Sequence, residues 1–401
     1  MLRNKGERRL RVLTAGGELE LNRRYFWAEG EGGVSPADAA VLGVGERAVS
    51  AGASEILCRL GMVQDFAQAA DDARRIGGLP VCKERLRQLV ESEAQAVTAA
   101  RRAGAVPAAW SAADAGVAAA GPVYAGVDGV MAPTVTRAEK DKRRAVHAVR
   151  RRQRSASGVG NAKPLPAARP GSDERYKEMK IGVFYDQDKA HRHAFATEGT
   201  SDSFAPLLRA FAAQVGFDKA ARAVSLTDGA RWVITQVCLA LTGLSAMLLD
   251  FYHLAQHVHA TARCCLGETA AAKDWAHARL AELKERGIAG VGLLLAEVDA
   301  LSKRLRSPAK RKSLRLLREY VVERMEMLGY RTALANGWDI GSGPTEATCK
   351  TLTLRLKRPG MKWDADHAAG MMNLIALYES GQAKAYWAVR ATQPDGYRAA
   401  A

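Results

Sequence analysis

The sequence has few of the features that mark disulfide-rich, membrane or secreted proteins. Its 401 residues include six cysteines, too few for a disulfide scaffold and typical of a reducing compartment. The longest apolar run, residues 237–249, is broken by Thr242, Gly243 and Ser245, so we expect no membrane span. The first residues include many charged side chains and no apolar segment of a secretory signal. We therefore expect a cytoplasmic protein of the nucleoid rather than a membrane or secreted one.

Acidic residues are also scarce compared with basic ones. The chain has 59 Lys and Arg against 43 Asp and Glu, a formal net charge of +16 at pH 7. Such a surplus attracts nucleic acid or an anionic membrane surface, although a generally Arg-rich proteome would also produce it. The charge is concentrated, because nine of the 18 residues in 137–154 and eight of the 16 in 303–318 are basic. These blocks favour phosphate contacts, with a solvated helix face as the alternative.

The first hundred residues predict a β-hairpin followed by helices. Residues 8–29 alternate polar and apolar side chains around a central Gly-Gly pair, which is typical of a hairpin. Helical spacing then predicts helices at 66–76 and 82–97, separated by a short Gly-containing turn. The second helix begins with Lys83 and Arg85. The pair resembles a DNA-binding helix-turn-helix, and an ordinary helical bundle would have the same pattern.

The middle of the chain predicts alternating strands and helices. The expected order is a strand, a β-hairpin, a helix, and then two strands that are each followed by a helix. This is the order of a ribonuclease H-like α/β core. The expected strands are 123–127, 180–185, 191–197, 223–226 and 246–249, and the expected helices are 203–215, 232–241 and 252–264. Further on, residues 344–356 and 367–379 predict helices, and the tail beyond them is expected to be irregular.

These patterns predict a fold of several parts. The 48% hydrophobic content is ample for a sizeable core. We expect an N-terminal β-hairpin in 1–35, a helical DNA-binding domain in 36–100, a linker in 101–120, the α/β domain in 121–267 and 333–388, an all-helical insertion in 268–332, and a tail in 389–401. Residues 155–173, rich in Ser, Gly and Pro, predict a loop within the α/β domain.

Two aspartates follow strand-like runs and are each followed by glycine. Asp128 comes after 123–127, and Asp228 comes after 223–227. Carboxylates at the carboxyl ends of neighbouring strands face the crevice of an open α/β sheet, and carboxylate oxygens are the ligands that Mg²⁺ prefers. Such a pair can hold two metal ions for phosphoryl transfer once a third carboxylate joins it. The alternative is that either Asp-Gly pair is a plain turn.

A longer motif near the C-terminus suggests the third carboxylate and a family. Residues 338–363, WDIGSGPTEATCKTLTLRLKRPGMKW, resemble the C-terminal signature of bacterial insertion-sequence transposases of the Kra type. These are DDE enzymes related to the Mutator-like transposases. The resemblance extends to VDG at 127–129, TDGARW at 227–232, LDFYHL at 249–254 and the last helix, and it covers most of residues 8–388.

The resemblance implies that Asp128, Asp228 and Glu346 hold two Mg²⁺ or Mn²⁺ ions. Glu346 lies in the first turn of a predicted helix, where free N–H groups favour an anion; a simple capping role is the alternative. It further implies that Asp250 and His253 support the site, although Asp250 competes with Asp228 for the role of second ligand. The zinc-binding cysteines often found around the N-terminal hairpin of relatives are lacking here, so no zinc is expected.

The expected partner is double-stranded DNA, both element ends and target. Trp338 is a candidate for stacking on an unpaired base, with a place in the core as the alternative. A homodimer or larger assembly on DNA is expected by resemblance. The candidate DNA-binding residues are Lys83, Arg85, Arg143, Arg144, Arg151, Arg304, Lys310, Arg311, Lys350, Arg355, Lys357 and Arg358.

The sequence therefore predicts a DNA transposase, which cleaves phosphodiesters at the element ends and transfers the strand into target DNA. Two alternatives stay open. One is a metal-dependent nuclease or resolvase on the same fold, which would cut without joining. The other is a catalytically silent DNA-binding protein derived from a transposase, in which the three carboxylates would be scattered.

Overall fold

The computed structural model describes residues 3–29, 32–35, 48–113, 121–156 and 176–392. Most of the loop predicted at 155–173, part of the linker predicted at 101–120, and the end of the chain lie outside these residues. Within them the protein is a mixed α/β structure with fourteen α-helices and a central five-stranded sheet. Three short 3-10 helices also occur, η1 (Ser201–Ser203), η2 (Phe217–Lys219) and η3 (Met325–Met327).

The central sheet is mixed, with strand order β7-β6-β4-β8-β9. Strands β4, β8 and β9 run parallel to one another, and β6 runs antiparallel to both of its neighbours. The predicted strands are all present. Their bounds are β4 Val123–Ala132, β6 Lys177–Asp186, β7 Arg192–Thr197, β8 Ala223–Thr227 and β9 Ala246–Leu249.

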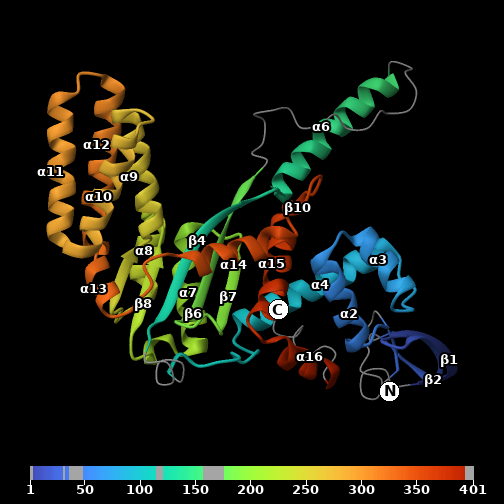
Figure 1. The fold of residues 1–401 in the computed structure, drawn as a ribbon. Coiled ribbons are helices and arrows are strands. Elements are labelled where there is room, and N and C mark those ends of the chain that lie inside the picture. The colour runs from blue at the N-terminus through green and yellow to red at the C-terminus, as the bar shows by residue number, and fades with distance from the viewer. Residues whose placement is uncertain (1–2, 30–31, 36–47, 114–120, 157–175, 393–401) are drawn as a thin grey trace.

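Helices cover both faces of this sheet (Figure 1). Alternate residues of β4 enter different cores: Val123 and Ala125 pack in the core that contains α7 (Phe204–Val215) and α8 (Arg231–Ala240). Tyr124 packs in the core that contains α14 (Gly343–Leu354) and α15 (Ala365–Glu379). This alternation is the period-2 geometry of a strand that is buried on both faces. The sheet is therefore the middle of three layers, with helices on each of its faces.

The N-terminal segment forms a hairpin and a helical unit that is joined to the sheet domain. The hairpin predicted at 8–29 is confirmed, as β1 (Arg3–Thr14) and β2 (Gly17–Ala28), with β3 (Gly32–Val34) added to β2. The helices are α2 (Ala51–Val63), α3 (Phe66–Arg75) and α4 (Lys83–Arg102). Helix α4 packs along α15, and residues of both lie in one hydrophobic core. The predicted boundary at residue 100 therefore does not separate two cores.

The residues predicted as an all-helical insertion, 268–332, contain helices and no strand, and α9 (Phe251–Leu266), which we predicted within the α/β domain, packs with them. Helices α9, α10 (Ala270–Arg286), α11 (Ile288–Arg304) and α12 (Pro308–Glu323) pack around their own apolar core, with α13 (Tyr330–Ala335) at the base. The unit stands at the left of Figure 1, at the side of the sheet where β8 lies.

Three elements differ from the expectation. The basic block 137–154, which lies outside the helices that we expected, forms a 20-residue helix, α6 (Arg137–Ala156), which projects from the body (Figure 1). The tail predicted to be irregular contains α16 (Ala383–Thr392), which is anchored because Tyr386 and Arg390 both donate hydrogen bonds to buried Glu93 of α4. A short parallel pair, β5 (Thr134–Val135) and β10 (Trp363–Asp364), was not predicted.

Candidate active site

The first two predicted carboxylates have corresponding positions relative to the parallel pair β4 and β8. In the parallel β4–β8 ladder, Ala125 is opposite Ser225, and each aspartate comes three residues later. Asp228 directly follows β8, as predicted. The prediction that the first strand ends at Asp128 is wrong, because β4 continues to Ala132 while it pairs with β6. Asp128 therefore lies within a strand, beyond the point where the pairing with β8 stops.

Helix α14 lies directly against β4 and brings the third carboxylate to the same face. Gly126 permits this approach, because a Cβ there would lie 1.9 Å from the Thr345 side-chain oxygen. The thiol of Cys349 is 3.5 Å from Asp128 Oδ2. Glu346 precedes Cys349 by three residues, so both lie on one side of α14. Glu346 is exposed, whereas Cys349 is buried.

The charges of Asp228 and Glu346 act on Asp128. The pKa of Asp128 is raised, first by burial and then by the negative charges of Asp228 and Glu346, against a hydrogen bond from the Gly129 amide that lowers it. Burial and the charge of Asp128 also raise the pKa of Cys349. Like charges close together disfavour ionisation. A cation between these carboxylates would relieve the repulsion, so the donor set fits a divalent metal ion.

Asp250 has a supporting contact. It is buried and caps α9, where Oδ1 accepts a hydrogen bond from the His253 amide at 2.8 Å. Its Oδ2 accepts from both the amide and the hydroxyl of Ser342, the residue before α14. Both oxygens are thus engaged within the protein, which favours Asp228 as the metal ligand. Asp250 joins the start of α9 to the start of the helix that carries Glu346.

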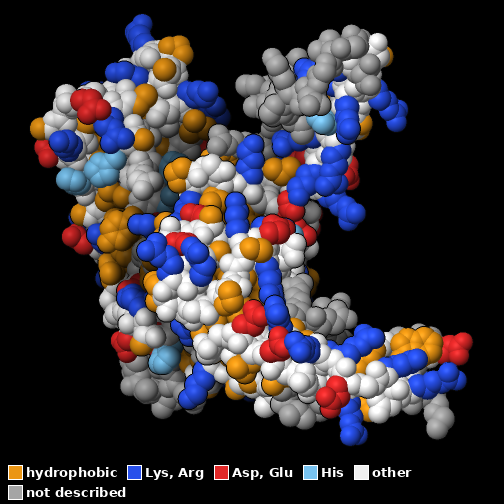
Figure 2. All heavy atoms as spheres, turned by 90° about the vertical axis from the view of Figure 1, so that its right-hand side faces the viewer, with side chains coloured by type: hydrophobic (Ala, Val, Ile, Leu, Met, Phe, Trp, Pro, Cys, Tyr) orange, Lys and Arg blue, Asp and Glu red, His pale blue; other side chains and the backbone are white. Residues whose placement is uncertain are grey.

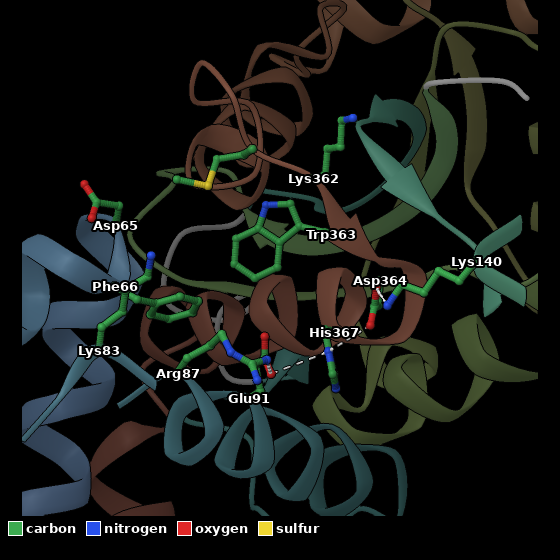
Figure 3. A pocket seen from close by; sticks show the side chains of 11 residues that line it. Asp65, Phe66, Lys83, Arg87, Glu91, Lys140, Lys362, Trp363, Asp364 and His367 are labelled. Carbon is green, nitrogen blue, oxygen red and sulfur yellow. Dashed lines mark hydrogen bonds and ion pairs between the residues drawn. The ribbon is translucent and has the colours of Figure 1, made fainter. Parts of the chain in front are cut away.

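A second group of side chains lies away from the three carboxylates. Within the part of the chain that the structure describes, Asp364, Asp366 and His367 are the one set of three whose ligand atoms all lie within 4.8 Å of one another, and this set could hold a metal ion. The oxygens of the predicted triad are not packed this closely. Lys140 forms an ion pair with Asp364, and His367 Nδ1 lies 3.6 Å from Glu91 (Figure 3).

A cavity of about 470 Å³ adjoins this cluster, between α3, α4 and β10. Phe66 and Trp363 line it with the side chains of Lys83 and Lys362 (Figure 3). No local pattern of residues indicates this cavity, because its walls come from segments nearly 300 residues apart.

Most of the predicted DNA-binding residues are on the surface. Figure 2 shows Lys and Arg side chains gathered along projecting α6 and on the adjoining face of the body. Arg143 and Lys310 are half-buried, and Lys310 donates to the Cys265 carbonyl. The exposed members are Lys83, Arg85, Arg144, Arg151, Arg304, Arg311, Lys350, Lys357 and Arg358.

Arg355 does not lie where we predicted. It is 2% exposed, and its Nε donates to the Gly61 carbonyl at 3.0 Å. Its guanidinium lies over the rings of Phe66 and Trp363, at 4.9 and 5.0 Å from their centroids. Arginine stacks readily between aromatic faces. Arg355 therefore links α14 to the N-terminal helices instead of facing DNA.

Trp338 and His253, two further predicted residues, lie against other side chains of the protein. Trp338 is partly buried and packs against the main core, which favours the core alternative over base stacking. The ring of His253 is 5.3 Å from that of His257. The sequence reasoning missed Thr345 and Cys349, which contact β4, and nothing in their local pattern marks them.

Neither a comparison with protein-family models nor one with curated proteins finds a match for this chain. Among the described residues, no helix is long and apolar enough to cross a membrane.

Proposed function

We propose that the protein is a DNA transposase of the DDE type, with a ribonuclease H-like catalytic core. The observation that carries this proposal is the common position of three carboxylates. Asp128 and Asp228 each come three residues after the last pair of the parallel β4–β8 ladder, and Glu346 lies on α14, which packs against β4. The negative charges of Asp228 and Glu346 both raise the pKa of Asp128, which supports a common site for the three carboxylates.

Strand order supports the same core. Along the chain β4 is followed, after α6, by the antiparallel β6–β7 hairpin, by α7, and by β8 and β9, each with a helix after it, which is the order that we expected from the sequence. The helical insertion between Asp228 and Glu346 fits the same resemblance.

The three carboxylates would hold the divalent metal ions. Bound Mg²⁺ or Mn²⁺ would stabilise the charge on the attacking and leaving oxygens of a phosphodiester. The chain's own contribution is to orient these ligands. Cys349 and the Gly129 amide hold the Asp128 carboxylate, and Asp250 fixes the loop that leads into α14. Catalysis of this kind depends mainly on positioning and charge stabilisation.

Basic surfaces on three sides of the site would hold the DNA. Helix α6 follows β4, the basic half of α12 lies on the insertion, and Lys350 and Lys357 follow Glu346. These cations would neutralise backbone phosphates and position the duplex without reading its sequence. We also propose a homodimer on paired element ends.

The test is strand cleavage and strand joining on DNA that carries the element ends, with Mg²⁺ or Mn²⁺. The variants Asp128→Asn, Asp228→Asn and Glu346→Gln are expected to lose both reactions. Asp364→Asn is the matched control, since it removes an acid from the separate cluster, and it should retain them. Cleavage without joining would instead identify a nuclease. Activity retained in Asp128→Asn or Glu346→Gln would refute the site.

A further inference from the structure

The end of α12 contacts the turn that carries Asp228. The Tyr320 hydroxyl donates a hydrogen bond to the Asp228 carbonyl at 3.1 Å. Arg324, the residue after α12, donates from Nε to the Gly229 carbonyl at 2.8 Å. Two consecutive backbone oxygens of the turn are thus held by the helical insertion, which lies about 90 residues further along the chain.

The two donors are themselves fixed. The Arg324 guanidinium lies 4.0 Å above the Tyr320 ring and donates to the Tyr320 carbonyl at 3.1 Å. On its other side, the Tyr320 ring stacks on His257 at 4.2 Å. Arg324 is 8% exposed. A buried charge is costly unless it is hydrogen-bonded, so the Gly229 carbonyl and the Arg324 side chain depend on each other.

The conformation of the turn at Gly229 allows Arg324 to approach the backbone closely. Gly229 has φ of +76°, a conformation that favours glycine. A Cβ at this position would also lie 2.8 Å from Arg324 Nε and 2.5 Å from Leu249 Cδ1. Close approach of the arginine therefore requires a residue without a side chain. On the turn itself, Asp228 Oδ1 accepts from the Ala230 amide at 3.0 Å.

We propose that Tyr320 and Arg324 are positioning residues that hold the Asp228 carboxylate in its metal-binding place. This proposal rests on the proposed function and gives the helical insertion a role inside the active site. Holding the carbonyls of two consecutive peptide units, Asp228–Gly229 and Gly229–Ala230, fixes the backbone from which the Asp228 carboxylate extends. Catalytic ligands gain from such support, because small misplacements weaken both binding and rate.

The test uses Tyr320→Phe, which removes the one hydroxyl and keeps the ring against His257 and Arg324. Tyr330→Phe is the matched control: this phenol is also buried in the insertion, and its hydroxyl has no hydrogen-bond partner within the described structure. Both are made in an Asp364→Asn background, so that the second acidic cluster does not contribute. Mn²⁺ binding is measured by electron paramagnetic resonance, together with amide hydrogen exchange of residues 227–231.

Tyr320→Phe is expected to weaken Mn²⁺ binding by about three- to tenfold, the effect of one hydrogen bond, and to speed exchange in the turn. Arg324→Lys, which keeps the charge but loses the planar donor, should act in the same direction. Tyr330→Phe should change neither measurement. Thermal unfolding of all variants serves to separate a local effect from general destabilisation.

Unchanged Mn²⁺ affinity and unchanged exchange in Tyr320→Phe would overturn the proposal. The same result in a protein that still cleaves DNA would leave the proposed function intact. Mn²⁺ binding that depends on Tyr320, in a protein that does not cut DNA, would support the positioning role and contradict the function. A wild-type chain that binds no Mn²⁺ would contradict both.

Discussion

Replacing Gly126 by alanine tests how closely α14 must lie against β4. The new Cβ would be 1.9 Å from Thr345 Oγ1 and 3.0 Å from Thr345 Cβ and Cγ2. Ordinary contact begins at 3.4 Å, so the nearest atoms must separate by about 1.5 Å. Thr345 is 3% exposed and β-branched, which leaves it little freedom to move away. Helix α14 must therefore shift, and Glu346 shifts with it.

The magnitude follows from two effects. Overpacking of this kind destabilises a protein by about 1–3 kcal/mol, and misplacing a catalytic group by about 1 Å lowers the rate by roughly a hundredfold. We expect Gly126→Ala to show both, measured as urea unfolding and as the rate of metal-dependent DNA cleavage. Adding Thr345→Ala removes Oγ1 and Cγ2, and should restore part of each loss.

The control for this experiment is Gly343→Ala at the start of α14. A Cβ there meets nothing within 4 Å, so stability and cleavage should stay near the wild-type values. The reasoning would be refuted if Gly126→Ala unfolded and cleaved like the wild type. It would also be refuted if Thr345→Ala brought no recovery, because the two changes must be coupled when their atoms collide.

Three further predictions follow from buried or perturbed charges. Arg390→Met leaves Glu93, 1% exposed, without its ion-pair partner, and should cost about 3–5 kcal/mol in urea unfolding; a loss below about 1 kcal/mol would contradict this. Because the fold disfavours ionised Asp128, Asp128→Asn without metal should have a higher thermal midpoint than the wild type at pH 7. This difference in midpoint should vanish as the pH falls through the raised pKa of Asp128. A difference that grows in acid would contradict the prediction. Arg355→Ala should lower stability and leave the salt dependence of DNA binding unchanged. Lys357→Ala should instead reduce the slope of the logarithm of the binding constant against the logarithm of salt concentration by about 0.9. The reverse pattern would place Arg355 on the DNA.

Elements with a strong local pattern could be predicted from the sequence. The Gly-Gly hairpin, the strands predicted at 223–226 and 246–249 and the helices of 268–332 all follow from periodicity and turn residues, and all are present. The corresponding positions of Asp128 and Asp228 were also foreseeable, because both follow short apolar runs of the sequence.

Features that depend on distant partners could not be predicted. Strand β4 continues beyond Asp128 because it pairs with β6, and no residue near Asp128 indicates that the strand continues. Helix α16 is held by Glu93, nearly 300 residues earlier in the chain. Arg355 belongs to a basic run that is typical of a surface, and only the aromatic pocket formed by Phe66 and Trp363 explains its burial.

We propose above all that Asp128, Asp228 and Glu346 bind divalent metal ions together, in a single active site that cleaves DNA. Anomalous diffraction from crystals of the protein with DNA and Mn²⁺ tests it most directly. The account predicts Mn²⁺ between the Asp128 and Asp228 carboxylates, on the face of the sheet covered by α14. Mn²⁺ bound at Asp364 and His367, with none at Asp128, would contradict it.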